Sequence, residues 1–168
     1  MPKVFVLLAV IVGAAVSLVT AASPSEAVPL ELLGGALGSA VGWAGGFFIA
    51  RTMATAWDLH SPDQRDILRL ASLAVAVPAG ASLSVLAVGS WQGVDGNGLL
   101  CAGGALLGMV VGMAVEPVLG WLVSALSPSG TAPSGVLGTA LEAVGFAAMV
   151  VAPAIGATVG FNVEAREH

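Results

Sequence analysis

Two acidic residues inside apolar stretches are the residues of this chain best placed to do chemistry. Glu116 lies four residues beyond Gly112 in a series of glycines spaced by four, and Glu142 lies on a similar small-residue face. Residues four apart share one face of a helix, so both carboxyls are expected to point toward a neighbouring helix rather than toward lipid. Such intramembrane acids are candidate proton or cation sites.

The spacing also predicts that the two acids lie at one depth. A turn centred near residues 129 and 130 separates them, and they are nearly equidistant from it along the chain. Two carboxylates at one level do not both stay ionised without a cation, so a shared proton or a bound cation is expected. The alternative is that neutral acids hydrogen-bond the neighbouring backbone and lock the two helices together.

Other ligand-bearing residues are sparse. His60 has Asp58 and Asp63 nearby, but a metal site needs more ligands, and a lone loop His usually faces solvent. Cys101 is the only cysteine, so it forms no intramolecular disulfide and no cysteine metal site, and it is expected to pack as a small apolar residue. We expect neither a metal nor a cofactor.

Enzyme motifs are absent from the sequence. It has no His-Glu-x-x-His pair, no Gly-x-Ser-x-Gly elbow, no Walker loop and no Cys-His nucleophile arrangement. Ser82 and Ser84 fall in an apolar stretch without a partner base. The chain is therefore expected not to be an enzyme.

The composition indicates an integral membrane protein. Of 168 residues 57% are hydrophobic and 9% are charged, with a mean hydropathy of +0.98, whereas soluble domains carry about 25% charged residues. A net charge of −5 with five basic residues excludes a nucleic-acid surface, which needs clustered Lys and Arg. A β-barrel is excluded because Leu99 to Val115 shows no polar alternation and the chain has no Tyr.

Glycine recurs every fourth residue in two of the apolar stretches. Each interior Gly costs about 1 kcal/mol in an aqueous helix, but in lipid the missing side chain lets two backbones approach closely. These glycines are therefore expected to mark helix-packing faces. They are Gly34, Gly38, Gly42 and Gly46 in the first stretch and Gly104, Gly108 and Gly112 in the second.

Apolar runs that contain at most one charged residue and are long enough to cross a bilayer predict an all-α, polytopic transmembrane helical bundle. The first run, within residues 1–27, is either a cleaved signal peptide or a fifth, signal-anchor helix, because Lys3 precedes it and small residues follow it. Residues 28–168 form the helical membrane domain. The candidate runs are Val4 to Ala22, Leu30 to Ala50, Leu70 to Gly89, Gly98 to Leu126 and Val136 to Phe161.

The basic residues predict the topology. Arg51, Arg65 and Arg69 fall between the second and third runs, which places the segment 51–69 in the cytoplasm and the C-terminus outside. Within this segment Ser61 followed by Pro62 predicts a helix start, with Ser as the cap and Pro at the first helical position.

A short internal repeat suggests two parallel hairpins. Gly34-Gly35-Ala36-Leu37 heads one run and Gly103-Gly104-Ala105-Leu106 heads another, and each run is followed by a returning helix. A match of this length also arises by chance in a chain rich in Gly, Ala and Leu, so duplication remains one of two interpretations.

The glycine series and the ending Pro153 to Asn162 resemble small bacterial envelope proteins with glycine-zipper segments. This resemblance implies a helical membrane protein and no particular activity. The layout of glycine-rich helix, polar loop and returning helix also looks like the proteolipid subunits of rotary ATPases. Those subunits carry a carboxyl near the middle of a returning helix, whereas Glu142 lies only seven residues into the last run, which argues against a rotor subunit.

We therefore expect a non-catalytic subunit or scaffold of the bacterial inner membrane that packs through glycine-rich helix faces. Its expected partners are the lipid bilayer and other membrane subunits or further copies of itself, with no nucleic acid. The alternative function is a proton, cation or small-solute conduit that uses Glu116 and Glu142.

Overall fold

The computed structural model describes residues 27–126 and 135–163, and these residues form four α-helices and no strand. The predicted signal peptide or anchor helix lies outside the described residues, apart from Ala27, the first residue of α2. The helices are α2 (Ala27–Ala56), α3 (Pro62–Trp91), α4 (Gly98–Leu126) and α5 (Val136–Asn162).

Local sequence signals account for two of the helix starts. α3 begins at Pro62 after Ser61, as the Ser-Pro pattern predicts, although the Ser61 side chain makes no capping hydrogen bond. α4 is capped by Asn97, whose Oδ1 accepts hydrogen bonds from the backbone N–H groups of Leu99 (2.9 Å) and Leu100 (3.0 Å). The segment 51–69 is mostly helical, because α2 continues to Ala56 and only a short connection precedes α3.

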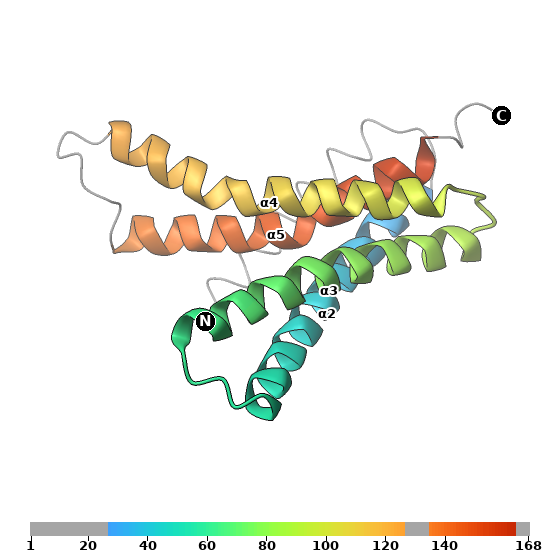
Figure 1. Cartoon of the computed structure of the whole chain (residues 1–168). Helices are drawn as coiled ribbons and strands as arrows, with labels where there is room; N and C mark the ends of the chain where they lie inside the picture. Colours follow the sequence, from blue (N-terminus) through green and yellow to red (C-terminus); the bar gives the residue numbers. More distant parts are fainter. Residues whose placement is uncertain (1–26, 127–134, 164–168) are drawn as a thin grey trace.

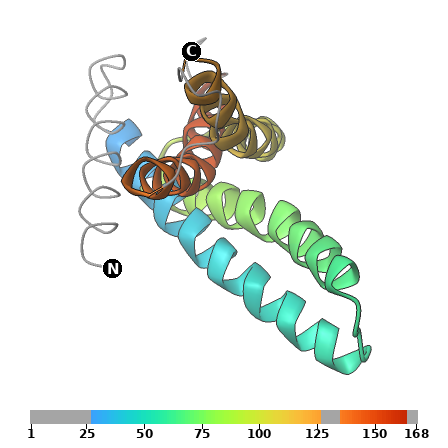
Figure 2. The same ribbon diagram turned by 90° about the vertical axis from the view of Figure 1, so that its left-hand side faces the viewer.

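The four helices form two antiparallel hairpins. α2 lies along α3, and α4 lies along α5, with fewer contacts between the hairpins than within them (Figure 1). The α3–α4 connection joins the hairpins at one end, while their other ends lie far apart. Figure 2, turned by 90°, shows the α2/α3 hairpin running obliquely away from α4/α5. The bundle is therefore closed at one end and open at the other.

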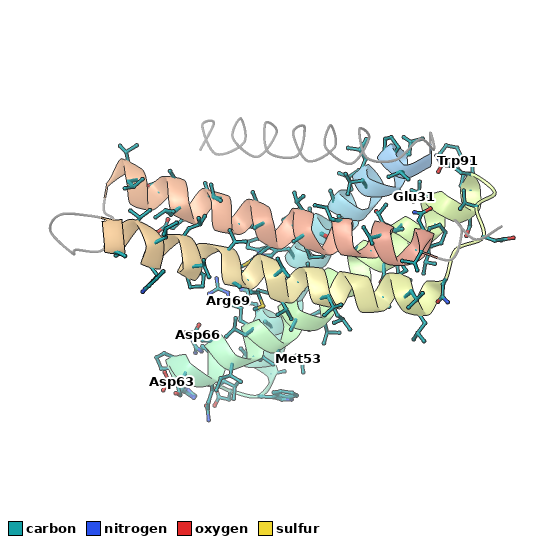
Figure 3. All side chains as sticks on the ribbon, turned by 90° about the horizontal axis from the view of Figure 1, so that it is seen from above. Glu31, Met53, Asp63, Asp66, Arg69 and Trp91 are labelled. Atoms are coloured by element: carbon teal, nitrogen blue, oxygen red, sulfur yellow. The ribbon has the colours of Figure 1, made fainter. Side chains whose placement is uncertain are left out.

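The two ends are named by their residues. The Glu31 end contains the start of α2, the end of α3, the start of α4 and the end of α5; the Arg69 end contains the opposite termini. Figure 3 labels Glu31 and Trp91 at the first end, and Asp63, Asp66 and Arg69 at the second. The main apolar core lies toward the Glu31 end and contains Ala81, Val85, Cys101, Ala105, Ala157 and Phe161.

All four helices are long and apolar enough to cross a membrane. They contain 27 to 30 residues each, about 40 to 45 Å at 1.5 Å per residue, so they exceed a hydrocarbon core of about 30 Å. Large apolar side chains cover much of the outer surface, including Leu37, Val41, Phe48, Val75, Leu83, Leu107 and Val110. This outer surface suits a hydrocarbon environment.

Candidate functional site

The first hairpin closes through glycines of α2. A methyl group built at Gly38 would overlap the carbonyl oxygen of Gly80, and one at Gly80 would overlap the carbonyl of Gly38. One turn farther, Gly42 lies equally close to the carbonyl of Ala76. Gly34 and Gly46, at the ends of this series, face side chains of α3 (Val88 for Gly34, Leu73 and Ala76 for Gly46) as well as backbone.

The second hairpin closes in the same way over a longer stretch. Gly104 lies against the carbonyl of Gly156, and Gly108 against the carbonyl of Ala152. At Gly112 the contact is looser, since a built Cβ would lie 2.7 Å from the carbonyl oxygen of Ala148. Helix backbones at these positions touch directly, which only a residue without a side chain permits.

Sequence reasoning missed the glycines on the receiving helices. Gly80 on α3 and Gly156 and Gly160 on α5 lie where the partner backbone approaches. Gly156 and Gly160 are themselves spaced by four, so this pair could have been found from the sequence. Gly80 stands alone on its face, and only the tertiary structure pairs it with Gly38.

The second hairpin opens toward the Arg69 end. Gly120 continues the α4 glycine series, yet nothing lies within 4 Å of a Cβ built there. Figure 1 shows the last turns of α4 leaving α5. The tight backbone contact is therefore confined to the part of the hairpin nearer the Glu31 end.

The register of α4 and α5 bears on the two acids picked out from the sequence. Gly104, Gly108 and Gly112 lie opposite Gly156, Ala152 and Ala148. Continued by one step, this register puts residue 116 opposite residue 144, two residues from Glu142 and about 3 Å along the axis. The Glu142 side chain is exposed, and the Glu116 side chain lies outside what the structure describes.

A different acid is buried. Glu31 on α2 is completely inaccessible to solvent, and its Oε2 accepts a hydrogen bond of 2.5 Å from Nδ2 of Asn162 on α5. The same Asn162 amide nitrogen donates to the carbonyl of Thr158 at 2.9 Å. The Glu31 carboxyl also lies against Gly89 of α3, with Oε1 3.4 Å from where a Cβ would stand. Three helices therefore meet around one carboxyl group.

Glu31 lies at the start of the predicted run Leu30 to Ala50, and no role was predicted for it from the sequence. One signal could have found it, because Gly35 follows Glu31 by four residues and places the acid on a small-residue face. The partner, Asn162, is the last residue of α5 and is 131 residues away, so no local pattern links the two.

A polar hollow of about 620 Å³ lies between α2 and α3 at the Arg69 end. Three arginines line it, together with Asp58 and Asp66; the arginines are Arg51, Arg65 and Arg69. Nε of Arg65 donates a 2.6 Å hydrogen bond to the carbonyl of Leu59. The guanidinium of Arg69 lies 4.0 Å from the centroid of the Phe47 ring and within 4.0 Å of Asp66, so these charges have internal partners.

His60 does not form a metal site with other described residues. His60 lies 3.6 Å from Asp58, with both side chains exposed, and no group of three or more His, Cys, Asp or Glu side chains in residues 27–126 and 135–163 is arranged to hold a metal ion. Cys101 is buried, and its thiol lies 3.7 Å from the carbonyl oxygen of Ser82.

Comparisons of the chain with protein-family models, with curated proteins and with solved structures found no match.

Proposed function

We propose that this chain is a non-catalytic integral membrane subunit or scaffold whose outer face receives a transmembrane segment of a partner. The observation that carries the proposal is an apolar groove of about 840 Å³ on the outside of the α4/α5 hairpin. Its lining is almost entirely hydrocarbon and small residues, without a charged side chain.

The shape of the groove favours a helix as the occupant. Its lining combines Gly104, Gly108, Gly156 and Gly160 with larger side chains, among them Leu107 and Val159. Small residues among larger ones let a second helix approach closely, which is how transmembrane helices associate when hydrocarbon supplies no hydrophobic drive. The partner segment is a further membrane subunit or a second copy of this chain.

Exposed tryptophans support insertion in a bilayer. Trp91 ends α3 at the Glu31 end, while Trp57 follows α2 and Trp121 lies in the last turns of α4, both toward the Arg69 end. Tryptophan favours the membrane interface, where its ring meets apolar chains and its N–H meets water. Two levels of exposed Trp at opposite ends of the bundle fit the two faces of a membrane.

The test blocks the groove without disturbing the fold. Gly103 lines the groove, and a Cβ built there meets nothing within 4 Å, so Gly103→Leu should fold and fill the groove. Gly45→Leu is the matched control, because Gly45 has the same free space and lies on α2, away from the groove. Purification in mild detergent should recover a larger assembly from wild type and Gly45→Leu, and a smaller one from Gly103→Leu.

Identical assemblies from the two variants, measured by light scattering and by identifying co-purified chains, would remove the groove from the proposal. A monomeric wild type without co-purified chains would remove the subunit function itself.

The proposed orientation puts the connection between α2 and α3 in the cytoplasm of a bacterial inner membrane and the C-terminus outside. Cysteine accessibility decides it: in a Cys101→Ser background, Asp63→Cys should react only after the membrane is opened. Asp95→Cys, in the α3–α4 connection, should react from outside intact cells. The reverse labelling pattern would contradict this orientation.

The second candidate function is a proton or cation conduit at Glu116 and Glu142. The α4/α5 register favours it, because it brings the two positions within two residues of one level. Proton or cation flux in liposomes should then be lost in both Glu116→Gln and Glu142→Gln while the fold persists. Flux that is absent from wild type, or retained in both variants, excludes this function.

A further inference from the structure

The Glu31 end contains an excess of buried oxygen atoms that lack a hydrogen-bond partner. Across the described residues, four buried side-chain atoms are unpartnered, and three of them are Glu31 Oε1, Gln92 Oε1 and Thr158 Oγ1. Glu31 is fully buried and Thr158 is 2% exposed. Buried polar groups in proteins are nearly always paired, so this concentration at one end requires an explanation.

The packing of α2 on α5 places Glu31 at the level of Thr158. A Cβ built at Gly35 would lie 3.1 Å from Cβ of Ala154, which sets the antiparallel register of these helices. Four residues back on α2 is Glu31, and four residues forward on α5 is Thr158, with Asn162 one turn farther. Glu31 therefore lies level with the Thr158–Asn162 face. Gln92 lies three residues beyond Gly89, the α3 residue that the Glu31 carboxyl contacts.

Counting donors against acceptors shows what is missing. Asn162 already donates to Oε2 and to the Thr158 carbonyl. The unpartnered Gln92 Oε1 and an ionised Glu31 Oε1 only accept hydrogen bonds, while the Thr158 hydroxyl supplies one donor. One proton added to Glu31 Oε1 changes it from an acceptor into a donor and so adds a second donor to this set.

The charges around Glu31 point the same way. Among the described residues toward the Glu31 end, the other groups that titrate are the Cys101 thiol of α4, buried in the main apolar core, and Asp95, exposed in the α3–α4 connection; the remaining charged residues of α3 and α5 lie toward the Arg69 end. Neither supplies positive charge. The arginines of the described residues lie at the opposite end, so no described cation compensates an ionised Glu31. A buried carboxylate without a cation is costly, and protonation removes that cost.

We propose that Glu31, Thr158 and Asn162 form a proton-binding site that joins the two hairpins. The proton comes from water and resides on Oε1, which has no other hydrogen-bond partner among the described residues, while Asn162 holds Oε2. Loss of the proton leaves a buried anion between α2 and α5 and weakens the docking of the hairpins. This site lies at the opposite end from Glu116 and Glu142 and does not depend on the partner groove.

Infrared difference spectroscopy of the full chain in nanodiscs tests for the proton. Wild type at about pH 7 should show the C=O stretch of a protonated carboxyl, and Glu31→Gln should lose the component of this absorbance that belongs to Glu31, whatever Glu116 contributes. Glu142→Gln is the matched control and should keep the band, because that acid is exposed. Asn162→Leu should keep the band but move it, because the hydrogen bond to Oε2 is lost, so the assignment does not rest on one variant.

The pH dependence of stability gives a second, independent readout. A fold that keeps a proton which its unfolded chain has already lost becomes less stable by up to about tenfold in its folding constant for each pH unit. This loss begins at the pH where the unfolded acid ionises and ends at the pH where the folded acid ionises. SDS-unfolding midpoints should therefore fall between about pH 5 and about pH 9 for wild type and stay level for Glu31→Gln. At the higher pH the variant should be the more stable protein.

Three results would overturn the proposal. The first is a protonated-carboxyl absorbance in Glu31→Gln that is equal to that of wild type. The second is evidence that Glu31 is ionised and paired with Arg166, which lies outside the described residues. In that case Arg166→Gln and Glu31→Gln would both destabilise the protein, by similar amounts and at every pH. The third is a sodium site: replacing potassium by sodium at constant pH would then stabilise wild type but not Glu31→Gln.

Discussion

The Glu31 end and the Arg69 end each contain carboxylic acids on apolar helices, and these acids differ in how deeply they are buried. Glu31 is completely buried where three helices meet, and Asn162 holds one of its oxygens. Glu142 is exposed near the start of α5. Both acids lie on faces with small residues at spacing four, so the spacing alone does not distinguish them.

The difference follows from the shape of the bundle. At the Glu31 end the hairpins are joined by a short connection and α2 also packs on α5, so a side chain there is enclosed. Toward the Arg69 end the hairpins part and α4 leaves α5, so a side chain on the same face meets no neighbour. Burial of an acid here depends on how many helices converge, which a one-helix pattern does not encode.

The strongest way to test this comparison uses two glycines of one helix face. Gly108→Leu pushes a side chain into the carbonyl of Ala152 and should cost about 3 kcal/mol or more, since backbones rather than flexible side chains must move. Gly120→Leu, about three turns on, meets free space and should change stability by less than about 0.5 kcal/mol. Thermal midpoints in detergent measure both changes. Equal midpoints for the two variants would contradict the conclusion that α4 packs tightly on α5 at one end of the hairpin and not at the other.

A smaller effect is expected from the link between the hairpins. Asn162→Leu removes the donor to Glu31 Oε2 and leaves the buried carboxyl without its partner, at a cost of about 1 to 3 kcal/mol. SDS-unfolding curves provide the measurement. The double variant Glu31→Leu with Asn162→Leu should lose less than the sum of the two single variants, because neither partner is then left unsatisfied. Strictly additive losses would show that the two groups do not interact.

The Arg69 end is expected to contribute less to stability. Arg69→Met keeps an unbranched apolar stem but removes the guanidinium from the Phe47 ring, which should cost about 0.5 to 1 kcal/mol. Arg51→Met is the control, because Arg51 lines the same hollow without a ring contact. A loss as large as that of Asn162→Leu would mean that this end is more tightly organised than its open shape indicates.

The smallest change is expected for the exposed acid. Glu142→Gln should alter the free energy of unfolding by less than about 0.5 kcal/mol, because the side chain is exposed. The same unfolding curves measure it beside Glu31→Gln. A large effect that disappears in a Glu116→Gln background would reveal a coupled pair and would favour the conduit.

The sequence by itself determined the helical, apolar character of this protein. Long apolar runs with a single charged residue predict helices of the length seen in α4 and α5, and Ser61-Pro62 predicts the start of α3. These features are local: hydropathy, backbone φ preference and capping act within one or two helical turns, so they can be read along the chain.

Only the tertiary structure decided which small residues meet and which acid is enclosed. Gly38 and Gly108 are equivalent in sequence pattern, yet Gly38 packs on the backbone of Gly80 and Gly108 on the backbone of Ala152. A Cβ built at Gly120 contacts nothing within 4 Å. Glu31 was passed over because its partner is 131 residues distant. Helix pairing and the angle between the hairpins arise from backbone contacts summed over whole helix faces. A row of glycines therefore predicts that another helix can pack closely on that face. It does not predict which helix packs there or which side chains become buried.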